Sequence, residues 1–136
     1  MVETVADLSL EDQFNEMLSA AAKLLEHRRD FQELMALNRP PNLLLEVLRL
    51  FYVYLKDVPS ENVTWTDILK LILQPHGMAK ELSKIEIENL SQNQMEALQM
   101  AASMESILRV SIAGEVVRKF MFEVHTYLAL KMRTQG

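Results

Sequence analysis

The chain has 136 residues and a formal net charge of −5, with 49% hydrophobic and 24% charged residues. This length suits one domain with its own core, and the composition is typical of a globular protein, which excludes extended disorder. The absence of cysteine excludes disulfides, thiolate zinc sites and cysteine nucleophiles.

Charge is distributed unevenly along the chain. Five acidic residues and no basic residue precede Lys23, and all 14 Lys and Arg residues lie from there onward. The body is therefore near neutral, which argues against nucleic acid as a partner. The acidic start is unlike a secretory signal. No uncharged apolar stretch approaches the roughly 18 residues that span a bilayer, so no membrane partner is expected. The lack of cysteine fits a reducing, cytoplasmic setting.

The predicted first helix begins near Ser9, whose hydroxyl can cap it. Apolar residues then recur with a 4-3-4 spacing that is typical of a coiled-coil seam, at Phe14, Leu18, Ala21 and Leu25. Arg28 falls where this seam would continue. Two interpretations remain open: the helix changes its packing partner there, or one long amphipathic helix carries an imperfect stripe.

Proline and capping signals divide the rest of the chain. Pro40 and Pro41 end the first helix, and a second helix to Lys56 is apolar all round, which predicts a buried central helix. Caps at Thr64 and Ser91 open helices to about residues 73 and 102, with a short helical turn over 78–84 between them. After a break at 103–106, the last helix runs to about residue 133 and contains Gly114, where close packing is expected.

Nothing in the sequence indicates catalysis. The three histidines, His27, His76 and His125, lie in different segments without a metal-binding spacing, and no phosphate-binding or serine-elbow motif occurs. We therefore expect no enzyme activity, cofactor or metal. The nine methionines are interpreted as core residues rather than as a binding groove.

Several basic residues could form a binding surface. Arg28 and Arg29 adjoin His27 late in the first helix, Lys70 lies on the helix opened by Thr64, and Arg109 is expected early in the last helix. Taken alone, each would be an ordinary solvated side chain. If they met on one surface, they would form a basic spot that suits an acidic protein partner.

The order and spacing of several short stretches resemble the microtubule-binding stalk tip of dynein heavy chains. The resemblance covers roughly residues 24–131 and rests on a Pro-Pro corner, a Trp-x-x-Ile helix, a segment before a capped helix, and the start of the return helix. These stretches are Leu37-Asn38-Arg39-Pro40-Pro41, Trp65 with Ile68 and Ile72, Glu88-Asn89-Leu90-Ser91, and Arg109-Val110-Ser111-Ile112-Ala113-Gly114 with Lys119-Phe120 and Tyr127.

The resemblance implies a fold, a function and a site. The fold would be an all-α compact bundle of about six helices in one domain, whose long first and last helices pair antiparallel as stubs of the stalk coiled coil (1–23 and 120–136) around a head (24–119). The head would bind tubulin with an affinity coupled to the register of the stalk helices. The implied tubulin-binding residues are His27, Arg28, Arg29, Lys70 and Arg109.

The resemblance also implies partners and a location. The partners would be microtubules and, in cis, the rest of a dynein motor, and the isolated domain is expected to be monomeric. The location would be the cytoskeleton, in the cytoplasm or in the axoneme of a cilium. Two alternatives stay open: a dynein-like scaffold that has lost tubulin binding and contacts another protein, and an unrelated helical adaptor with a groove for a partner helix.

Overall fold

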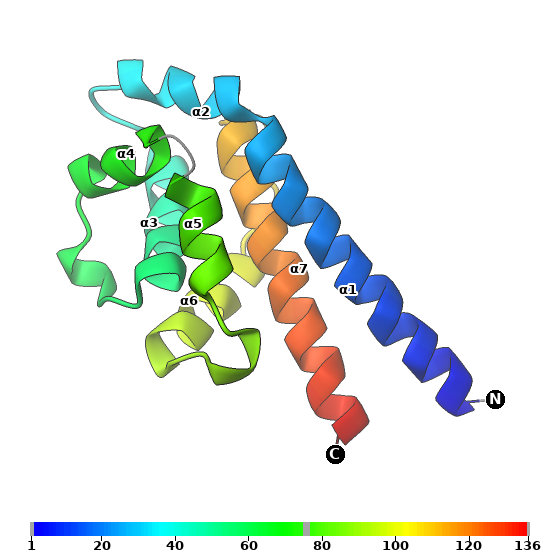
Figure 1. Ribbon diagram of the computed structural model, residues 1–136. Coiled ribbons are helices and arrows are strands. Elements are labelled where there is room, and N and C mark those ends of the chain that lie inside the picture. Colours follow the sequence, from blue (N-terminus) through cyan, green and yellow to red (C-terminus); the bar gives the residue numbers. More distant parts are fainter. Residues whose placement is uncertain (1, 75–76, 136) are drawn as a thin grey trace.

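The described chain is helical. The computed structural model describes residues 2–74 and 77–135, which form seven α-helices, three 3-10 helices and no strand (Figure 1). The predicted all-α class is confirmed. The predicted number of six helices is wrong, because the expected first helix is two helices, α1 (Val2–Glu26) and α2 (Arg28–Glu33), followed by the 3-10 turn η1 (Leu34–Ala36).

The break between α1 and α2 falls at His27, one residue before Arg28. The Nδ1 atom of His27 lies 2.8 Å from Oδ2 of Asp30, so a side-chain contact joins the junction residue to the first turn of α2, although the His27 side chain makes no hydrogen bond to the backbone there. Two interpretations of this region were open: a change of packing partner, or one long helix with an imperfect stripe. The structure supports the first, because α1 ends at Glu26 and α2 begins at Arg28. The expected start at Ser9 is wrong: Ser9 lies inside α1, because no glycine or proline precedes it to stop the helix.

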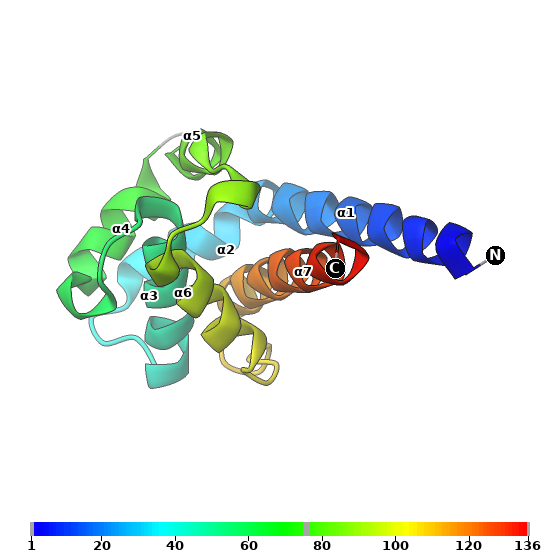
Figure 2. The same cartoon turned by 90° about the horizontal axis from the view of Figure 1, so that it is seen from below.

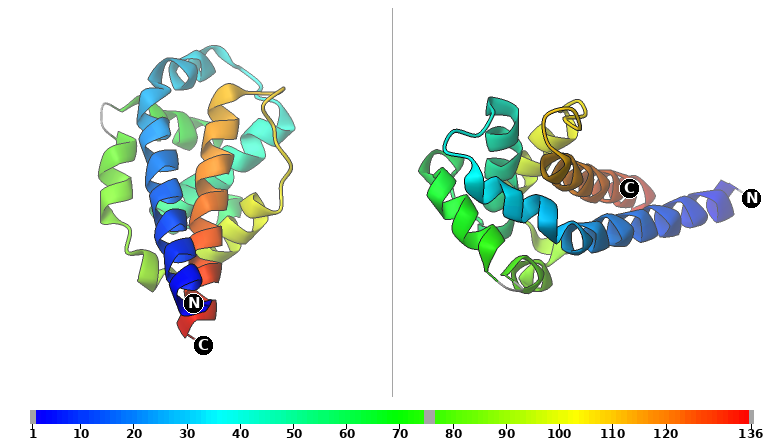
Figure 3. Two further views of the ribbon diagram at one scale, coloured as in Figure 1. Left: turned by 90° about the vertical axis from the view of Figure 1, so that its right-hand side faces the viewer. Right: turned by 90° about the horizontal axis from the view of Figure 1, so that it is seen from above.

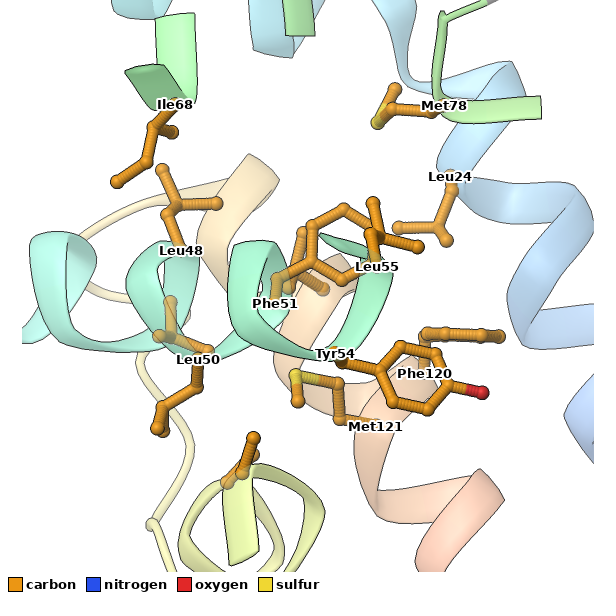
Figure 4. Packing of buried hydrophobic residues seen from close by; sticks show 14 of the residues in the cluster. Leu24, Leu48, Leu50, Phe51, Tyr54, Leu55, Ile68, Met78, Phe120 and Met121 are labelled. Atoms are coloured by element: carbon orange, nitrogen blue, oxygen red, sulfur yellow. The ribbon is translucent and has the colours of Figure 1, made fainter. Parts of the chain in front are cut away.

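Helix α3 (Asn42–Lys56) is the central helix, as its apolar sequence predicted. Eight of its side chains are buried, and Phe51 and Tyr54 pack edge-on against Phe120 of the last helix (Figure 4). It ends at Asp57, which adopts a left-handed conformation (φ 54°) and accepts a hydrogen bond from the hydroxyl of Ser91 at 2.5 Å. The core is therefore organised around α3.

Three shorter helices surround α3 (Figure 2). Helices α4 (Trp65–Leu73) and α6 (Gln92–Ala102) each begin with a complete capping box, formed by Thr64 with Asp67 and by Ser91 with Gln94, so both predicted caps are confirmed. Helix α5 (Gly77–Lys84) matches the predicted short turn. The 3-10 turns η2 (Ser60–Asn62) and η3 (Ile87–Asn89) lie in the connections. Pro75 and His76, expected to end α4, lie outside the described residues.

The last helix, α7 (Ile112–Gln135), begins later than expected, and residues 103–111 are not helical. The cause is a contact beyond the neighbouring residues: the backbone N–H of Ile107 donates to the carboxylate of Glu115, eight positions further along, and the Ser111 hydroxyl accepts from the N–H of Gly114 at the start of α7. Gly114 permits the predicted close packing: a Cβ there would lie 2.8 Å from Cδ1 of Ile107 and 2.9 Å from Cδ1 of Leu44.

Helices α1 and α7 lie side by side and run in opposite directions, so that both chain ends lie at the same end of the molecule (Figure 3). The face that α1 buries differs from the predicted seam. Met17, Ala20 and Leu24 are buried, whereas the expected seam residues Phe14, Leu18 and Leu25 are 38%, 51% and 50% exposed. The helix is therefore rotated by about 100°, one residue step, from the expected orientation.

Candidate functional site

The predicted site residues lie on three elements: α2 with its junction to α1, the helix α4, and the turn at residues 108–110. The α2 helix and the start of α7 lie at the end of the molecule opposite both termini (Figure 1). Arg28, Arg29, Lys70 and Arg109 are all exposed, and His27 is partly buried. We call these five residues the distal basic residues.

Helix α2 is held by its apolar face. Phe31 is buried within α2 and Leu34 within η1, which fixes the helix against the core. Arg28 and Arg29 are both exposed. Arg28 lines a shallow groove together with Ile72 of α4 and Met78 of α5. The first arginine of the pair thus lies on the side of α2 that faces α4.

Helix α4 is tied to the Pro-Pro corner. The indole Nε1 of Trp65 donates to the carbonyl oxygen of Leu37 at 3.2 Å, and Ile68 and Ile72 are buried. Lys70 lies between these two on the exposed face. The backbone N–H and hydroxyl of Thr64 lower the pKa of Asp67 below its ordinary value, so the cap of α4 stays charged and intact near neutral pH.

Arg109 lies in the turn before α7 and not, as expected, within the helix. Glu115 and Arg118 hold this segment. The Glu115 carboxylate accepts from the hydroxyl of Ser106 (2.8 Å) and from the N–H of Ile107 (3.1 Å), and Arg118 donates to the carbonyl of Met104 (3.3 Å). Burial works to raise the pKa of Glu115, but the hydrogen bonds from Arg118, Ser106 and Ile107 outweigh it and lower the pKa to about 2. Arg109 is therefore carried on a fixed turn.

A groove of about 430 Å³ separates this turn from α2 and η1. Most of the side chains that line it are apolar, and its polar lining includes Asp30 and Glu33 on the α2 side and Arg109 on the other. Leu108, Val110 and Ile112 beside it are 58%, 40% and 49% exposed. A concentration of large exposed apolar side chains within five residues is characteristic of an interaction surface.

Four of the five basic side chains of the site are available to bind a partner. In the described part of the chain, Arg28, Arg29, Lys70 and Arg109 make no ion pair, whereas Lys56, Lys84, Arg118, Lys119 and Lys131 each pair with a glutamate. The surroundings are not purely basic, because Glu26, Asp30 and Glu33 line a groove with Arg28 and Arg29. The electrostatic character of this end is therefore mixed.

Sequence reasoning missed the two residues that position Arg109. Arg118 was not among the candidate residues, yet its side chain is only 12% exposed and pairs with Glu115. The spacing of Glu115 and Arg118 by three positions on one helix signals a side-chain pair. Nothing in the sequence indicated that the pair also binds the backbone of residues 104–107.

Among the residues that the structure describes, no three His, Asp or Glu side chains are grouped to hold a metal ion, and no helix is both long and apolar enough to cross a membrane. Comparisons with protein-family models and with curated proteins find no match to the chain.

Proposed function

We propose that this chain is the microtubule-binding tip of the stalk of a dynein heavy chain or dynein-like protein. The observation that carries the proposal is the placement of unpaired cations: Arg28, Arg29 and Arg109 lie at the end opposite both termini, exposed and without ion pairs among the described residues. An acidic protein surface such as that of tubulin is the partner that such side chains steer and orient.

In this proposal, residues 1–23 and 120–136, which contain most of α1 and the later part of α7, are the stubs of the stalk's antiparallel coiled coil, and residues 24–119 are the head. Their side-by-side packing and the position of both termini support this assignment. ATP hydrolysis belongs to the rest of the motor chain, which is the partner in cis. The location follows from the function: the cytoskeleton, in the cytoplasm or in an axoneme.

The geometry also supports coupling between the stalk and the site. Arg28 follows α1 after a single junction residue, His27, so axial movement of α1 against α7 moves α2 and its arginines. Arg109 precedes α7 and is tied to it through Glu115. A slide of α1 therefore changes the placement of Arg28 relative to Arg109. Two packings that differ by a few kcal/mol would suffice to switch the affinity.

Microtubule cosedimentation tests the proposal. Arg28→Glu with Arg109→Glu should weaken binding by about tenfold or more at low salt, because two steering charges are reversed. The matched control is Lys80→Glu with Arg133→Glu, which changes the net charge equally at exposed positions of α5 and the end of α7. Equal binding by the two double variants would disprove the proposed face.

A second candidate function is favoured by one observation. The apolar groove rimmed by Asp30, Glu33 and Arg109 suits a protein partner that is not strongly acidic. The alternative is therefore a dynein-like scaffold domain that does not bind tubulin and contacts another protein. The test is cosedimentation at low salt of the wild type and of variants in which an engineered disulfide fixes α1 against α7, either in the observed register or one helical turn away. Absence of binding by all of them would select this alternative.

A further inference from the structure

The buried face of α1 has the 3-4-3-4 spacing of a coiled-coil seam and one polar member. Its residues are Leu10, Gln13, Met17, Ala20 and Leu24, of which the last three are buried and the first two partly buried. Gln13 is therefore the exception in an otherwise apolar seam. A single polar residue at such a position lowers stability but specifies register.

From Leu10 to Ala20, apolar packing alone does not select the observed register. If α1 slides by one helical turn, each seam residue is replaced by the residue four positions later. Phe14 takes the place of Leu10, and Met17 takes the place of Gln13. These replacements keep the seam apolar from Leu10 to Ala20 and remove its polar member. At the other end of the seam the packing opposes the slide, because Arg28 would take the place of the fully buried Leu24. Since Phe14 is 38% exposed in the observed register, its burial would favour the slide.

The partner of Gln13 opposes that slide. Glu123 of α7 is only 5% exposed. The Nε2 atom of Gln13 donates to Oε2 of Glu123 at 2.5 Å and to its main-chain oxygen at 3.1 Å, and Nζ of Lys119 lies 3.2 Å from Oε1. Both carboxylate oxygens thus have partners. A buried carboxylate that loses such a partner is strongly disfavoured.

No other seam residue can replace Gln13. A slide of one turn in one direction brings Met17 to the level of Glu123, and methionine has no hydrogen to donate. A slide in the other direction brings Ser9, whose side chain is two bonds shorter than that of glutamine. In the observed register alone, a long amide side chain lies opposite the buried carboxylate.

We propose that the hydrogen bond between Gln13 and Glu123 is a register lock, which sets the axial position of α1 against α7. Without the lock, the register displaced by one turn, with Met17 opposite residue 123, gains population. This inference deepens the proposed function, because register is the variable that would control the grip on a microtubule. The lock itself is a property of two helices and can be measured without tubulin.

Engineered disulfides can report the register, because the chain has no cysteine of its own. Phe14→Cys with Tyr127→Cys reports the observed register, in which the two rings lie 5.4 Å apart between centroids. Leu18→Cys with Tyr127→Cys reports the register displaced by one turn. The quantity measured is the ratio of the two rates of disulfide formation in a glutathione buffer.

Removing the lock should shift this ratio by about tenfold toward the second pair, in both Gln13→Leu and Glu123→Leu. Gln13→Lys keeps a long donor and should retain the original ratio. Glu16→Leu adds the same apolar surface at an exposed position of α1 and should also leave the ratio unchanged. A general loss of stability would not produce this pattern.

The outcomes separate this inference from the proposed function. An unchanged ratio in both Gln13→Leu and Glu123→Leu overturns the lock, whatever the cosedimentation result. If Glu123→Leu fails to fold, Gln13→Leu decides alone, since Lys119 still pairs with the carboxylate of Glu123 in that variant. A shifted ratio supports the lock even if the wild-type chain does not bind microtubules, in which case the proposed function alone falls.

Discussion

Arg118 donates two hydrogen bonds to the carboxylate of Glu115, from Nε to Oε1 at 2.6 Å and from Nη2 to Oε2 at 3.0 Å. Each oxygen of that carboxylate also accepts from the segment before α7, one from the N–H of Ile107 and the other from the hydroxyl of Ser106. The pair therefore fixes a non-helical segment that carries Arg109.

Replacing Glu115 with glutamine should loosen the segment. The change keeps the shape but removes the charge that accepts four hydrogen bonds, so we expect a loss of about 1–3 kcal/mol in the free energy of unfolding. Hydrogen exchange at the amide of Ile107 should accelerate, which distinguishes local loosening from a global effect. Glu105→Gln, at an exposed neighbouring position, serves as the control and should change neither quantity.

The same carboxylate predicts a specific pH dependence. Its pKa falls from an ordinary 4.5 to about 2 in the folded chain, so the unfolded state binds the proton more readily. The contribution to stability is therefore complete above about pH 5 and is lost as the pH falls toward 2. Denaturation curves of the wild type and Glu115→Gln should differ most near neutral pH and converge near pH 2. A constant difference over this range would contradict the assignment.

Two glycines should respond differently to alanine. At Gly77, a Cβ would lie 2.8 Å from the backbone oxygen of Leu71, which cannot move aside, so Gly77→Ala should cost about 1–3 kcal/mol. At Gly114, the close atoms are the terminal methyl carbons of Ile107 and Leu44, which can shift when those side chains change their torsion angles. Better helix propensity, about 1 kcal/mol, should offset that adjustment, leaving Gly114→Ala near neutral. Urea denaturation of the two variants side by side measures the difference.

Trp65→Phe tests the link between α4 and the Pro-Pro corner. The substitution keeps an aromatic ring and removes the N–H that donates to the carbonyl of Leu37, so we expect a loss of about 0.5–1.5 kcal/mol. Because Trp65 is the one tryptophan, unfolding should be followed by circular dichroism. Trp65→Phe with wild-type stability would show that apolar packing alone holds the corner.

Local signals in the sequence were sufficient for much of the fold. The capping boxes at Thr64 and Ser91 involve residues three positions apart, and both helices begin where those residues predict. The apolar circumference of α3 likewise predicted a central helix. These features depend on neighbouring residues only, so they can be recognised without knowledge of the tertiary structure.

Features that depend on distant contacts could not be predicted. The seam of α1 was expected at Phe14 and Leu18, but the helix is rotated so that Gln13 meets Glu123, which is 110 positions away along the chain. The turn that carries Arg109 looked helical by composition, and its departure from a helix depends on the carboxylate of Glu115. In the candidate site, the exposure of Arg28 and Lys70 matched the helical patterns, but the acidic rim formed by Asp30 and Glu33 was not anticipated.

The uneven distribution of acidic side chains has a consequence for how the domain approaches a charged object. Glu11, Asp12 and Glu16 are exposed on α1 toward the end that carries both termini, and Arg28, Arg29 and Arg109 are exposed at the opposite end. Because Glu26, Asp30 and Glu33 offset the arginines at that end, the asymmetry comes mainly from the acidic start of α1, which makes the end with both termini the more negative one and gives the molecule a dipole along the α1–α7 pair. A negatively charged filament exerts a torque on such a dipole and turns the arginine-bearing end toward itself before contact, over a distance of about 10 Å at 0.1 M salt.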